Sequence, residues 1–445
     1  MTSTDTTPLL GNGADGRSRR LSYKERIVGI FSIPEGQPGW IQSYRYFLLG
    51  SWSNVLLVFV PLSFISHNLN WDAGLRFSFS FIAIMPLAKL LGDATDQLSL
   101  KLGQTLSGLL NASFGNAVEI IVAIAALLQD ELRVVQTSLL GSILSNLLLV
   151  LGCSFLAGGL MHDQNRFRTT AAQTSASLMT LACITLVIPA AYFMSQTIGE
   201  GGGLDPTKAD QPGAIEERCK SGLLIISRGT SILLLLVYVA YLVFQLKTHA
   251  RLFDEDGDDT EDCEDGQGLP RRHHSQDDVE EPEMAPITAG IALLLVTLVT
   301  SFAADYLVAS IEETTERYNI PKPFIGLILL PLVSNAAEHV TSVWMAMKNK
   351  MEMTIGICVG SSIQISAFVI PLLVIIGWIT GHDLTLFFAT FETIVLFVSV
   401  LLVNLLVQDG KSNYMEGLML IALYCVVALS CELPYVHPSR LPCAD

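Results

Sequence analysis

Charged residues are scarce in this chain of 445 residues. Asp, Glu, Lys and Arg make up 15% of it, hydrophobic residues make up 51%, and the mean hydropathy is +0.49. A typical soluble domain has about 25% charged residues. The apolar residues also lie in long runs, so the composition excludes a soluble enzyme and predicts a membrane protein. Residues 1–45 contain no apolar run, so no cleaved signal peptide is expected there.

Cysteines and long soluble stretches are also few. The eight cysteines have no regular spacing, and four fall within apolar runs: Cys153, Cys183, Cys358 and Cys425. This pattern argues against a disulfide framework and predicts reduced, buried thiols. No soluble stretch is long enough for a nucleotide-binding domain, which excludes an ion-pumping ATPase. We therefore expect a protein that is not an enzyme, needs no cofactor and binds no nucleic acid.

The long apolar runs predict about eleven transmembrane helices. A bilayer core of about 30 Å needs roughly 20 helical residues. Stretches of that size occupy residues 46–66, 74–92, 105–128, 134–160, 169–194, 222–246, 285–309, 321–347, 353–378, 383–407 and 414–432. The predicted fold is an all-α polytopic membrane protein, with one extra helix (46–66) followed by two inverted five-helix repeats (74–246 and 285–432). This number of spans excludes a seven-helix receptor.

Three polar segments complete the predicted organisation. They are a basic N-terminal tail (1–45), an acidic linker between the repeats (247–284) and a short C-terminal tail (433–445). If the N-terminal tail is cytosolic, sixteen Lys and Arg lie on the cytosolic side and nine on the other. Positive charge favours the cytosolic side of a membrane protein. The linker is then cytosolic, and eleven spans place the C-terminus in the lumen.

The acidity of the chain is concentrated in the linker. Residues 254–283 hold fourteen Asp and Glu against Arg271 and Arg272, which gives −12 of the chain's net charge of −16. Like charges repel one another, and the segment has few apolar side chains to bury, so most of it is expected to be a solvated linker. The alternative is a loop that collects cations near the cytosolic mouth. An EF-hand is disfavoured because Asp259 replaces its invariant glycine.

Two short stretches of the chain match without a gap at an offset of 219 residues. Residues 115–119 match 334–338, and residues 141–145 match 360–364. Each half thus has an acid, Glu119 or Glu338, near the middle of a predicted span. An unpaired charge there costs at least about 2.5–3.5 kcal/mol. A protonated, packed glutamate is the alternative, but recurrence at the same repeat position favours a functional site.

The residues around the two acids predict the kind of ion that binds. Carboxylate, amide and carbonyl oxygens suit Ca²⁺, with Mn²⁺ as an alternative, whereas Zn²⁺ would draw Cys and His. Small and polar residues favour local helix breaks that expose carbonyl groups, and Pro331 removes one helical N–H in the second half. Ordinary helix packing is an equal alternative for any single one of them. The expected lining residues are Gly115, Asn116, Ser142, Ser145, Asn146, Ser334, Asn335, Ser361, Ser362 and Gln364.

The two acids also predict a way to couple ion movements. Protons and a metal ion would compete for the same carboxylate oxygens, and mutual exclusion of two ions is the basis of antiport. His339 directly follows Glu338, and Ile120 holds its place in the first half. It could relay protons to Glu338, or it could be a packed, neutral histidine.

At these residues the chain resembles a known family. GNAVEI with GSILSNLLLVLG, and SNAAEHV with GSSIQISAFVIP, resemble the paired repeat motifs of CAX-type Ca²⁺/H⁺ exchangers, a branch of the cation/Ca²⁺ antiporter superfamily. The resemblance covers residues 40–435 and is closest to fungal vacuolar exchangers. Sodium-coupled relatives usually have proline where Val118 and Ala337 stand here, which favours proton coupling. The resemblance implies that Glu119 and Glu338 bind the cation and that Asn116, Asn335 and Gln364 line the site.

The resemblance also implies regulation, a membrane and an exchange reaction. In the family the acidic linker forms a cytosolic helix, which implies a regulatory role for Asp254, Glu255, Asp256, Asp258, Asp259, Glu261 and Asp262. We expect cytosolic Ca²⁺ to be exchanged for lumenal H⁺ across a vacuolar or other acidic organelle membrane. A Na⁺- or K⁺-coupled exchanger and a channel are the alternatives. In the tail, residues 5–10 resemble a dileucine sorting signal for an adaptor, and residues 19–22 resemble a kinase site.

Overall fold

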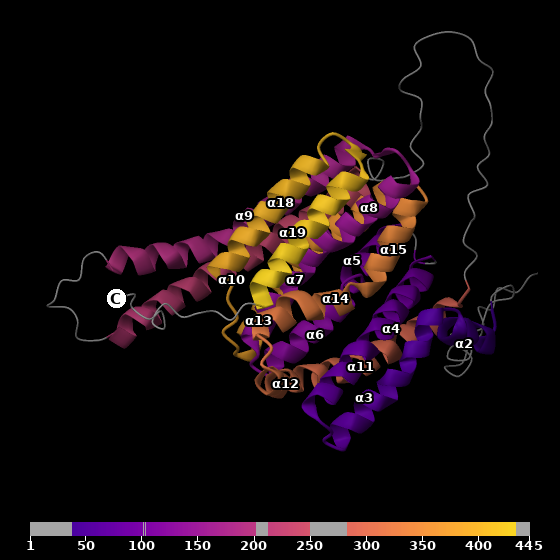
Figure 1. The fold of residues 1–445 in the computed structure, drawn as a ribbon, viewed down its shortest axis with the longest axis horizontal. Coiled ribbons are helices and arrows are strands. Elements are labelled where there is room, and N and C mark those ends of the chain that lie inside the picture. Colours follow the sequence, from indigo (N-terminus) through magenta and orange to yellow (C-terminus); the bar gives the residue numbers. More distant parts are fainter. Residues whose placement is uncertain (1–37, 101, 103, 202–211, 250–282, 433–445) are drawn as a thin grey trace, which may run out of the picture.

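The computed structural model describes residues 38–100, 102, 104–201, 212–249 and 283–432 (Figure 1). These residues form a bundle of helices with one short pair of strands, so the predicted all-α polytopic membrane fold is confirmed. The two motifs of the N-terminal tail, the acidic segment 254–262 and the C-terminal tail lie outside the described residues.

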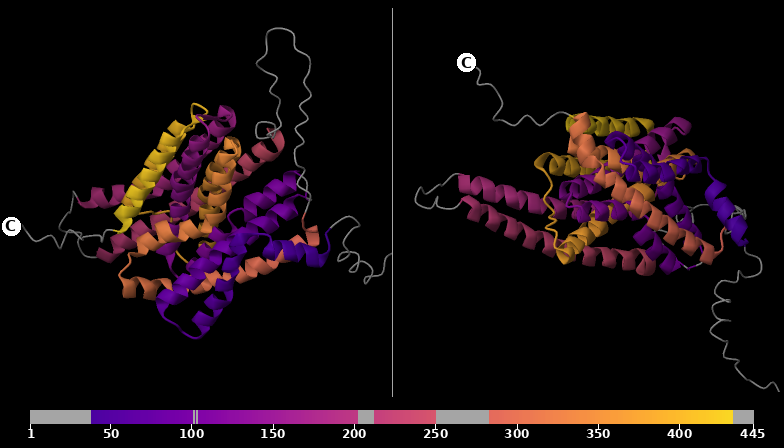
Figure 2. Two further views of the ribbon diagram at one scale, coloured as in Figure 1. Left: turned by 45° about the vertical axis from the view of Figure 1, so that its right-hand side comes forward. Right: turned by 90° about the horizontal axis from the view of Figure 1, so that it is seen from below.

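The described part of the first half begins with a bent helix pair, followed by the elements of the first repeat. Their bounds are α2 Trp40–Leu49, η1 Trp52–Val58, α3 Phe59–Asn68, α4 Ala73–Ser99, α5 Gln104–Phe114, α6 Ala117–Leu128, α7 Leu132–Leu144, η2 Ser145–Val150, α8 Leu151–Met161, β1 Asn165–Arg166, α9 Thr169–Gly201, α10 Pro212–Val243 and η3 Phe244–Thr248. In Figures 1 and 2, α9 and α10 form a hairpin that extends beyond the rest of the bundle.

The second half repeats this order after residue 283. Its elements are α11 Pro286–Ala309, α12 Ile311–Tyr318, α13 Lys322–Phe324, η5 Ile325–Leu329, α14 Leu330–Ser334, α15 Ala336–Met347, α16 Met351–Gln364, η6 Ile365–Val369, α17 Ile370–Thr380, α18 Thr390–Leu406, β2 Lys411–Ser412 and α19 Tyr414–Glu432. The short helix α12 and the β1–β2 pair were not expected from the sequence.

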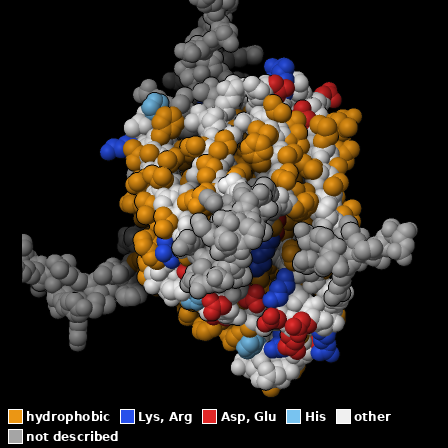
Figure 3. Space-filling view, turned by 90° about the vertical axis from the view of Figure 1, so that its left-hand side faces the viewer, with side chains coloured by type: hydrophobic (Ala, Val, Ile, Leu, Met, Phe, Trp, Pro, Cys, Tyr) orange, Lys and Arg blue, Asp and Glu red, His pale blue; other side chains and the backbone are white. Residues whose placement is uncertain are grey.

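Within the described residues, seven helices are long and apolar enough to cross a membrane, and nine if each of two bent pairs counts as one span. The shorter apolar helices α6 and α18 stand where the third and tenth spans were expected. The exact number of eleven stays a prediction. Figure 3 shows apolar side chains covering most of one face, with many of the charged side chains toward its lower end, as expected for a surface in contact with lipid.

Two expected spans differ from the structure. The first, 46–66, is a bent pair: α2 meets η1 and α3 at 86°. The bend lies at Gly50, where a Cβ atom would stand 2.5 Å from the carbonyl oxygen of Tyr46, so glycine permits the close approach. The tenth span starts at Thr390 and not at residue 383, because the residues before it run without helical structure from the left-handed Gly381. The five described cysteines are free, but the expected burial is found only in part, because Cys153 is half-buried and Cys425 is exposed.

The two halves pack around each other with exchanged partners. Helix α6 packs against α11, and its counterpart α15 packs against α4. In the same way α8 packs against α19 while α17 packs against α10, and α9 packs against its own counterpart α18. Such an exchange is what a pseudo-two-fold axis between two repeats produces. Because each repeat is predicted to have five spans, an odd number, equivalent helices would run in opposite directions.

Ion pairs join the halves mainly at one end of the bundle, where α12 lies. Among the described residues, six pairs link the halves there: Asp72–Arg317, Arg76–Glu313, Asp130–His382 when the ring is protonated, Glu131–Lys322, Arg133–Glu392 and Arg228–Asp383. The opposite end has one, Arg168–Glu352. The Tyr318 hydroxyl donates to Asp72 over 2.9 Å and, with the nearby Arg317, lowers the pKa of that carboxyl.

Candidate cation-binding site

Each of the two acids lies in the first turn of a helix that follows a break. In the first half α5 ends at Phe114, and α6 begins after Gly115 and Asn116 with Glu119 as its third residue. In the second half α14 ends at Ser334, and α15 begins after Asn335 with Glu338 as its third residue. The second break bends the segment by 58°. A helix N-terminus has partial positive charge and favours a carboxylate.

Small residues permit these breaks. A Cβ atom on Gly115 would stand 2.6 Å from the carbonyl oxygen of Asn111, so only glycine fits the close turn. Pro331 has no N–H to donate inside the second segment. The local breaks expected from the sequence are therefore present in both halves.

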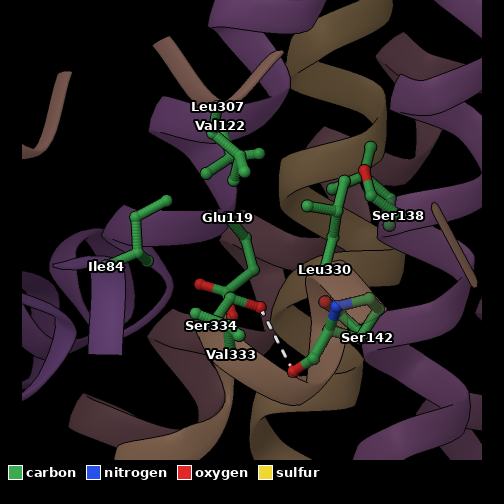
Figure 4. A pocket seen from close by; sticks show the side chains of 11 residues that line it. Ile84, Glu119, Val122, Ser138, Ser142, Leu307, Leu330, Val333 and Ser334 are labelled. Carbon is green, nitrogen blue, oxygen red and sulfur yellow. Dashed lines mark hydrogen bonds between the residues drawn. The ribbon is translucent and has the colours of Figure 1, made fainter. Parts of the chain in front are cut away.

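Glu119 borders a narrow pocket between the halves (Figure 4). Its side chain is 7% exposed. Ser138 and Ser142 of α7 line the pocket from the first half, and Ser334 lines it from the second. The Ser334 hydroxyl interacts with the Glu119 carboxylate and makes a long hydrogen bond of 3.5 Å to the carbonyl of Pro331. The free volume of about 10 Å³ admits little more than one water molecule or a bare ion.

Glu338 is half-buried and follows the helix break at Asn335, whereas Ser334 precedes it. It interacts with the side chains of Asn146 and Ser361 and lies close enough to Glu119 for the two charges to repel. Its Oε2 atom is buried and has no hydrogen-bond partner among the described residues. A buried carboxylate oxygen without a partner is costly unless a proton or a cation occupies it.

A chain of hydrogen bonds connects the lining residues of both halves. Asn146 donates through Nδ2 to the Ser361 hydroxyl over 2.9 Å, and Ser361 donates to Oδ1 of Asn116 over 2.8 Å. Asn116 donates in turn to Oε1 of Gln364 over 2.6 Å. Every bond in this chain crosses between the halves. The Oδ1 atom of Asn146 is buried, has no hydrogen-bond partner within the part of the chain that the structure describes, and is available to a ligand.

The equivalent asparagine of the second half bonds to the backbone of the first half. Asn335 donates through Nδ2 to the backbone carbonyl of Ser142 over 3.2 Å. The Ser145 hydroxyl is buried and interacts with the side chain of Tyr424. Ser138 was not expected from the sequence, although its position four residues before Ser142 places both on one face of α7.

Two expected residues stand apart from this network. The Ser362 hydroxyl donates to the carbonyl of Cys358 in its own helix over 2.8 Å, so it is already engaged there. The half-buried His339 ring makes no hydrogen bond with a described residue. A role for either residue stays a prediction.

Comparison with known proteins agrees with this duplicated architecture. The family model for "Sodium/calcium exchanger protein" matches residues 73–247 and 288–431. The chain belongs to this family. It is 42% identical to the vacuolar calcium ion transporter of Schizosaccharomyces pombe, over 96% of this chain and 92% of that protein. It is also 42% identical to vacuolar cation/proton exchanger 2 of Oryza sativa subsp. japonica, over 94% and 91%.

Solved structures of exchangers have the same fold. Native YfkE matches with a TM-score of 0.66 and 32% identity, over 86% of this chain and all of that one. A selenium-substituted structure of the same Ca²⁺/H⁺ antiporter protein gives 0.66 and 31%, over 88% and 100%. The H⁺/Ca²⁺ exchanger CAX, at 12% identity, shares the fold with a TM-score of 0.62, over 89% and 90%. The expected resemblance to CAX-type exchangers is confirmed.

The donor groups at the site suit a hard cation. No group of three or more His, Cys, Asp and Glu side chains that could hold a metal occurs among the described residues. Ca²⁺ accepts carboxylates together with amide, hydroxyl and carbonyl oxygens. In this member of the exchanger family the available donors are therefore two carboxylates and neutral oxygens.

Proposed function

We propose that the protein is a secondary active antiporter that exchanges cytosolic Ca²⁺ for lumenal H⁺ across the membrane of a vacuole or other acidic organelle. The main support is the pair of acids at equivalent helix breaks, with one buried carboxylate oxygen of Glu338 that has no hydrogen-bond partner among the residues described. The names of the relatives agree with this proposal, since they include a vacuolar calcium ion transporter, a vacuolar cation/proton exchanger and a Ca²⁺/H⁺ antiporter.

The coupling follows from competition for the same oxygens. Ca²⁺ would bind with both carboxylates ionised, because its two charges offset their mutual repulsion. When Ca²⁺ leaves, protons would take its place on Glu119 and Glu338, since two bare charges so close in a poorly solvated site are costly. Alternating access of the site to the two sides then moves either Ca²⁺ or protons, but not both together.

The coupling ion and the cargo each have an alternative. Val118 and Ala337 stand where sodium-coupled relatives usually have proline, which favours protons over Na⁺ or K⁺. Mn²⁺ prefers the same oxygen donors as Ca²⁺ and is an alternative cargo. We propose a cytosolic N-terminus and a lumenal C-terminus from the distribution of Lys and Arg. The regulatory role of the acidic segment 254–262 and the two tail motifs remain predictions.

Uptake of Ca²⁺ into proteoliposomes with an acidic interior tests the proposal. The wild type should take up Ca²⁺, and a protonophore should abolish the uptake. Glu119→Gln and Glu338→Gln keep the shape of each side chain but remove its charge, so uptake should fall to the level of protein-free vesicles. Glu316→Gln, on the exposed face of α12, is the matched control and should behave as the wild type.

Three results would contradict the proposal in different ways. Uptake that follows a sodium or potassium gradient and ignores the pH gradient would make the protein a Na⁺- or K⁺-coupled exchanger. Steady Ca²⁺ conduction without proton counterflow would make it a channel. Full activity in either Gln variant would place the site elsewhere.

A further inference from the structure

A polar groove lies on the outer surface of the bundle, away from the cation site. It has a volume of about 310 Å³ and lies between α9 and the end of α18. Its lining residues are Gln173, Ser177, Leu401, Asn404, Leu405 and Gln408. Leu405 is 68% exposed, so the groove opens outward from the bundle. Lipid-facing surfaces are normally apolar, and four uncharged polar side chains in one groove therefore need a partner.

The hydrogen bonds within the groove leave capacity for a ligand. Asn404 donates through Nδ2 to the Thr180 hydroxyl over 3.1 Å, and Gln173 donates to the carbonyl of Gln408 over 3.3 Å. An amide side chain has two donor hydrogens and an acceptor oxygen, so each of these amides can make further bonds. These bonds hold the Gln173 and Asn404 side chains in place and use only part of their hydrogen-bonding capacity.

Two basic residues lie on the β1–β2 pair, close in sequence to the groove-lining ends of α9 and α18. Arg166 lies directly opposite Lys411 in the antiparallel register. Both side chains are exposed, and neither makes an ion pair within the described part of the chain. Like charges directly opposite one another destabilise a strand pair. The Asp409 carboxylate nearby accepts a hydrogen bond from the backbone N–H of Lys411 over 3.1 Å, and its one negative charge offsets only one of the two positive charges.

The strand pair is held close to the groove. The N–H of Phe167 donates to the carbonyl of Gly410 over 3.0 Å. Helix α9 begins at Thr169, one turn before Gln173, and Lys411 follows Gln408 by three residues. The two positive charges and the polar groove therefore lie at the same end of α9 and α18. The distribution of Lys and Arg predicts that this end is cytosolic, where the leaflet has a negative surface potential.

We infer that the groove binds one anionic glycerophospholipid of the cytosolic leaflet. Its phosphate lies between Arg166 and Lys411, where it relieves their repulsion. Its glycerol and ester oxygens accept hydrogen bonds from Gln173 and Asn404, and an acyl chain covers Leu401 and Leu405. The acidic linker could supply negative charge to the basic pair, but its charged sequence offers little to cover the leucines.

Native mass spectrometry of the full-length protein in detergent, titrated with phosphatidylserine or phosphatidylcholine, tests this inference. We expect one tightly bound phosphatidylserine per wild-type chain and much weaker binding of phosphatidylcholine. Arg166→Gln with Lys411→Gln should weaken phosphatidylserine binding about 30-fold, roughly fivefold for each basic residue. Ser177→Leu with Asn404→Leu should weaken it as well, although it changes no charge. Soluble glycerophosphate should not compete, because it lacks the acyl chain.

The control variant removes two positive charges at positions outside the groove. Arg45→Gln with Lys350→Gln changes two exposed basic residues outside the groove and should bind as the wild type does. Equal binding of both lipids, or unchanged binding in the Arg166 and Lys411 variant, would overturn the inference. A wild-type mass of two chains that the groove variants reduce to one would assign the groove to a second copy. Absence of lipid binding, with the linker becoming protease-sensitive in the charge variant, would assign the basic pair to the linker.

Discussion

The two halves of the chain share a framework but not a set of contacts. Both have a helix break before the acid, and both have a π-helical turn after the motif serine, three residues after Ser142 at η2 and four residues after Ser361 at η6. Yet Glu119 is buried beside Ser334. Glu338 is half-buried, interacts with Asn146 and Ser361, and has one oxygen without a hydrogen-bond partner in the described segments. π-helical turns often mark functional sites because they interrupt regular backbone bonding.

The substitutions between the halves explain these differences. Asn146 of the first half corresponds to the apolar Ile365 of the second. Ser145 corresponds to Gln364, so at this position the first half has a hydroxyl and the second an amide. Glycine shows the same inequality: a Cβ atom on Gly141 would stand 2.2 Å from the carbonyl oxygen of Leu327, whereas one on Gly360 would meet open space. Duplication has thus supplied one composite site between unequal halves and not two equal sites.

Apart from the two acids themselves, the largest effect should come from Asn146, an amide at a position that is apolar in the second half. Asn146→Leu removes the donor to Ser361 and the interaction with Glu338, which leaves that carboxylate poorly oriented. Loss of such a supporting partner typically weakens metal binding by about 10–100-fold. We expect the concentration of Ca²⁺ for half-maximal uptake in proteoliposomes to rise by a factor in this range.

The matched control is the equivalent position in the second half. Ile365→Leu conserves volume in a fully buried apolar position and should leave the Ca²⁺ dependence close to that of the wild type. Equal losses in both variants would show that the two halves contribute alike and that the inequality has no functional consequence.

A smaller effect should come from the ion pairs that hold the unequal halves together. Arg133 of the first half pairs with Glu392 of the second, whose side chain is 5% exposed, and Arg133→Gln would leave this buried acid without its counter-charge. Breaking a fully buried pair costs about 3–5 kcal/mol, and the partial exposure of Arg133 reduces this to roughly 2 kcal/mol. The melting temperature in detergent should fall clearly.

Arg317→Gln separates the effect of burial from the loss of charge. It breaks the pair with Asp72, in which the arginine is 54% exposed, and exposed pairs contribute about 1 kcal/mol or less. Its melting temperature should stay near that of the wild type. A larger loss in Arg317→Gln than in Arg133→Gln would mean that the exposed connection of α12, and not the buried pair, joins the halves at this end.

The sequence predicted the framework of the site better than its contacts. The offset of 219 residues located both acids and both breaks, because glycine, asparagine and proline constrain the backbone locally. It could not show that Ser361 donates to Asn116 across the halves, or that Ser362 bonds within its own helix, since both depend on how α16 is rotated against α6. The bend at Gly50 was missed because hydropathy reports the length of an apolar run and not its direction.

The smallest effect should come from His339, which has no counterpart in the first half. His339→Ile makes this position match Ile120, and the ring makes no hydrogen bond with a described residue. Glu338 is itself partly exposed, so protons can reach it without the ring, and we expect the rate of Ca²⁺ uptake to change by about threefold or less, under roughly 0.7 kcal/mol. Uptake should be measured over a range of lumenal pH, with His339→Gln as a polar control that cannot titrate. If both variants lose most of the uptake at every pH while still binding Ca²⁺, His339 relays protons, and the second half contributes a step that the first half lacks.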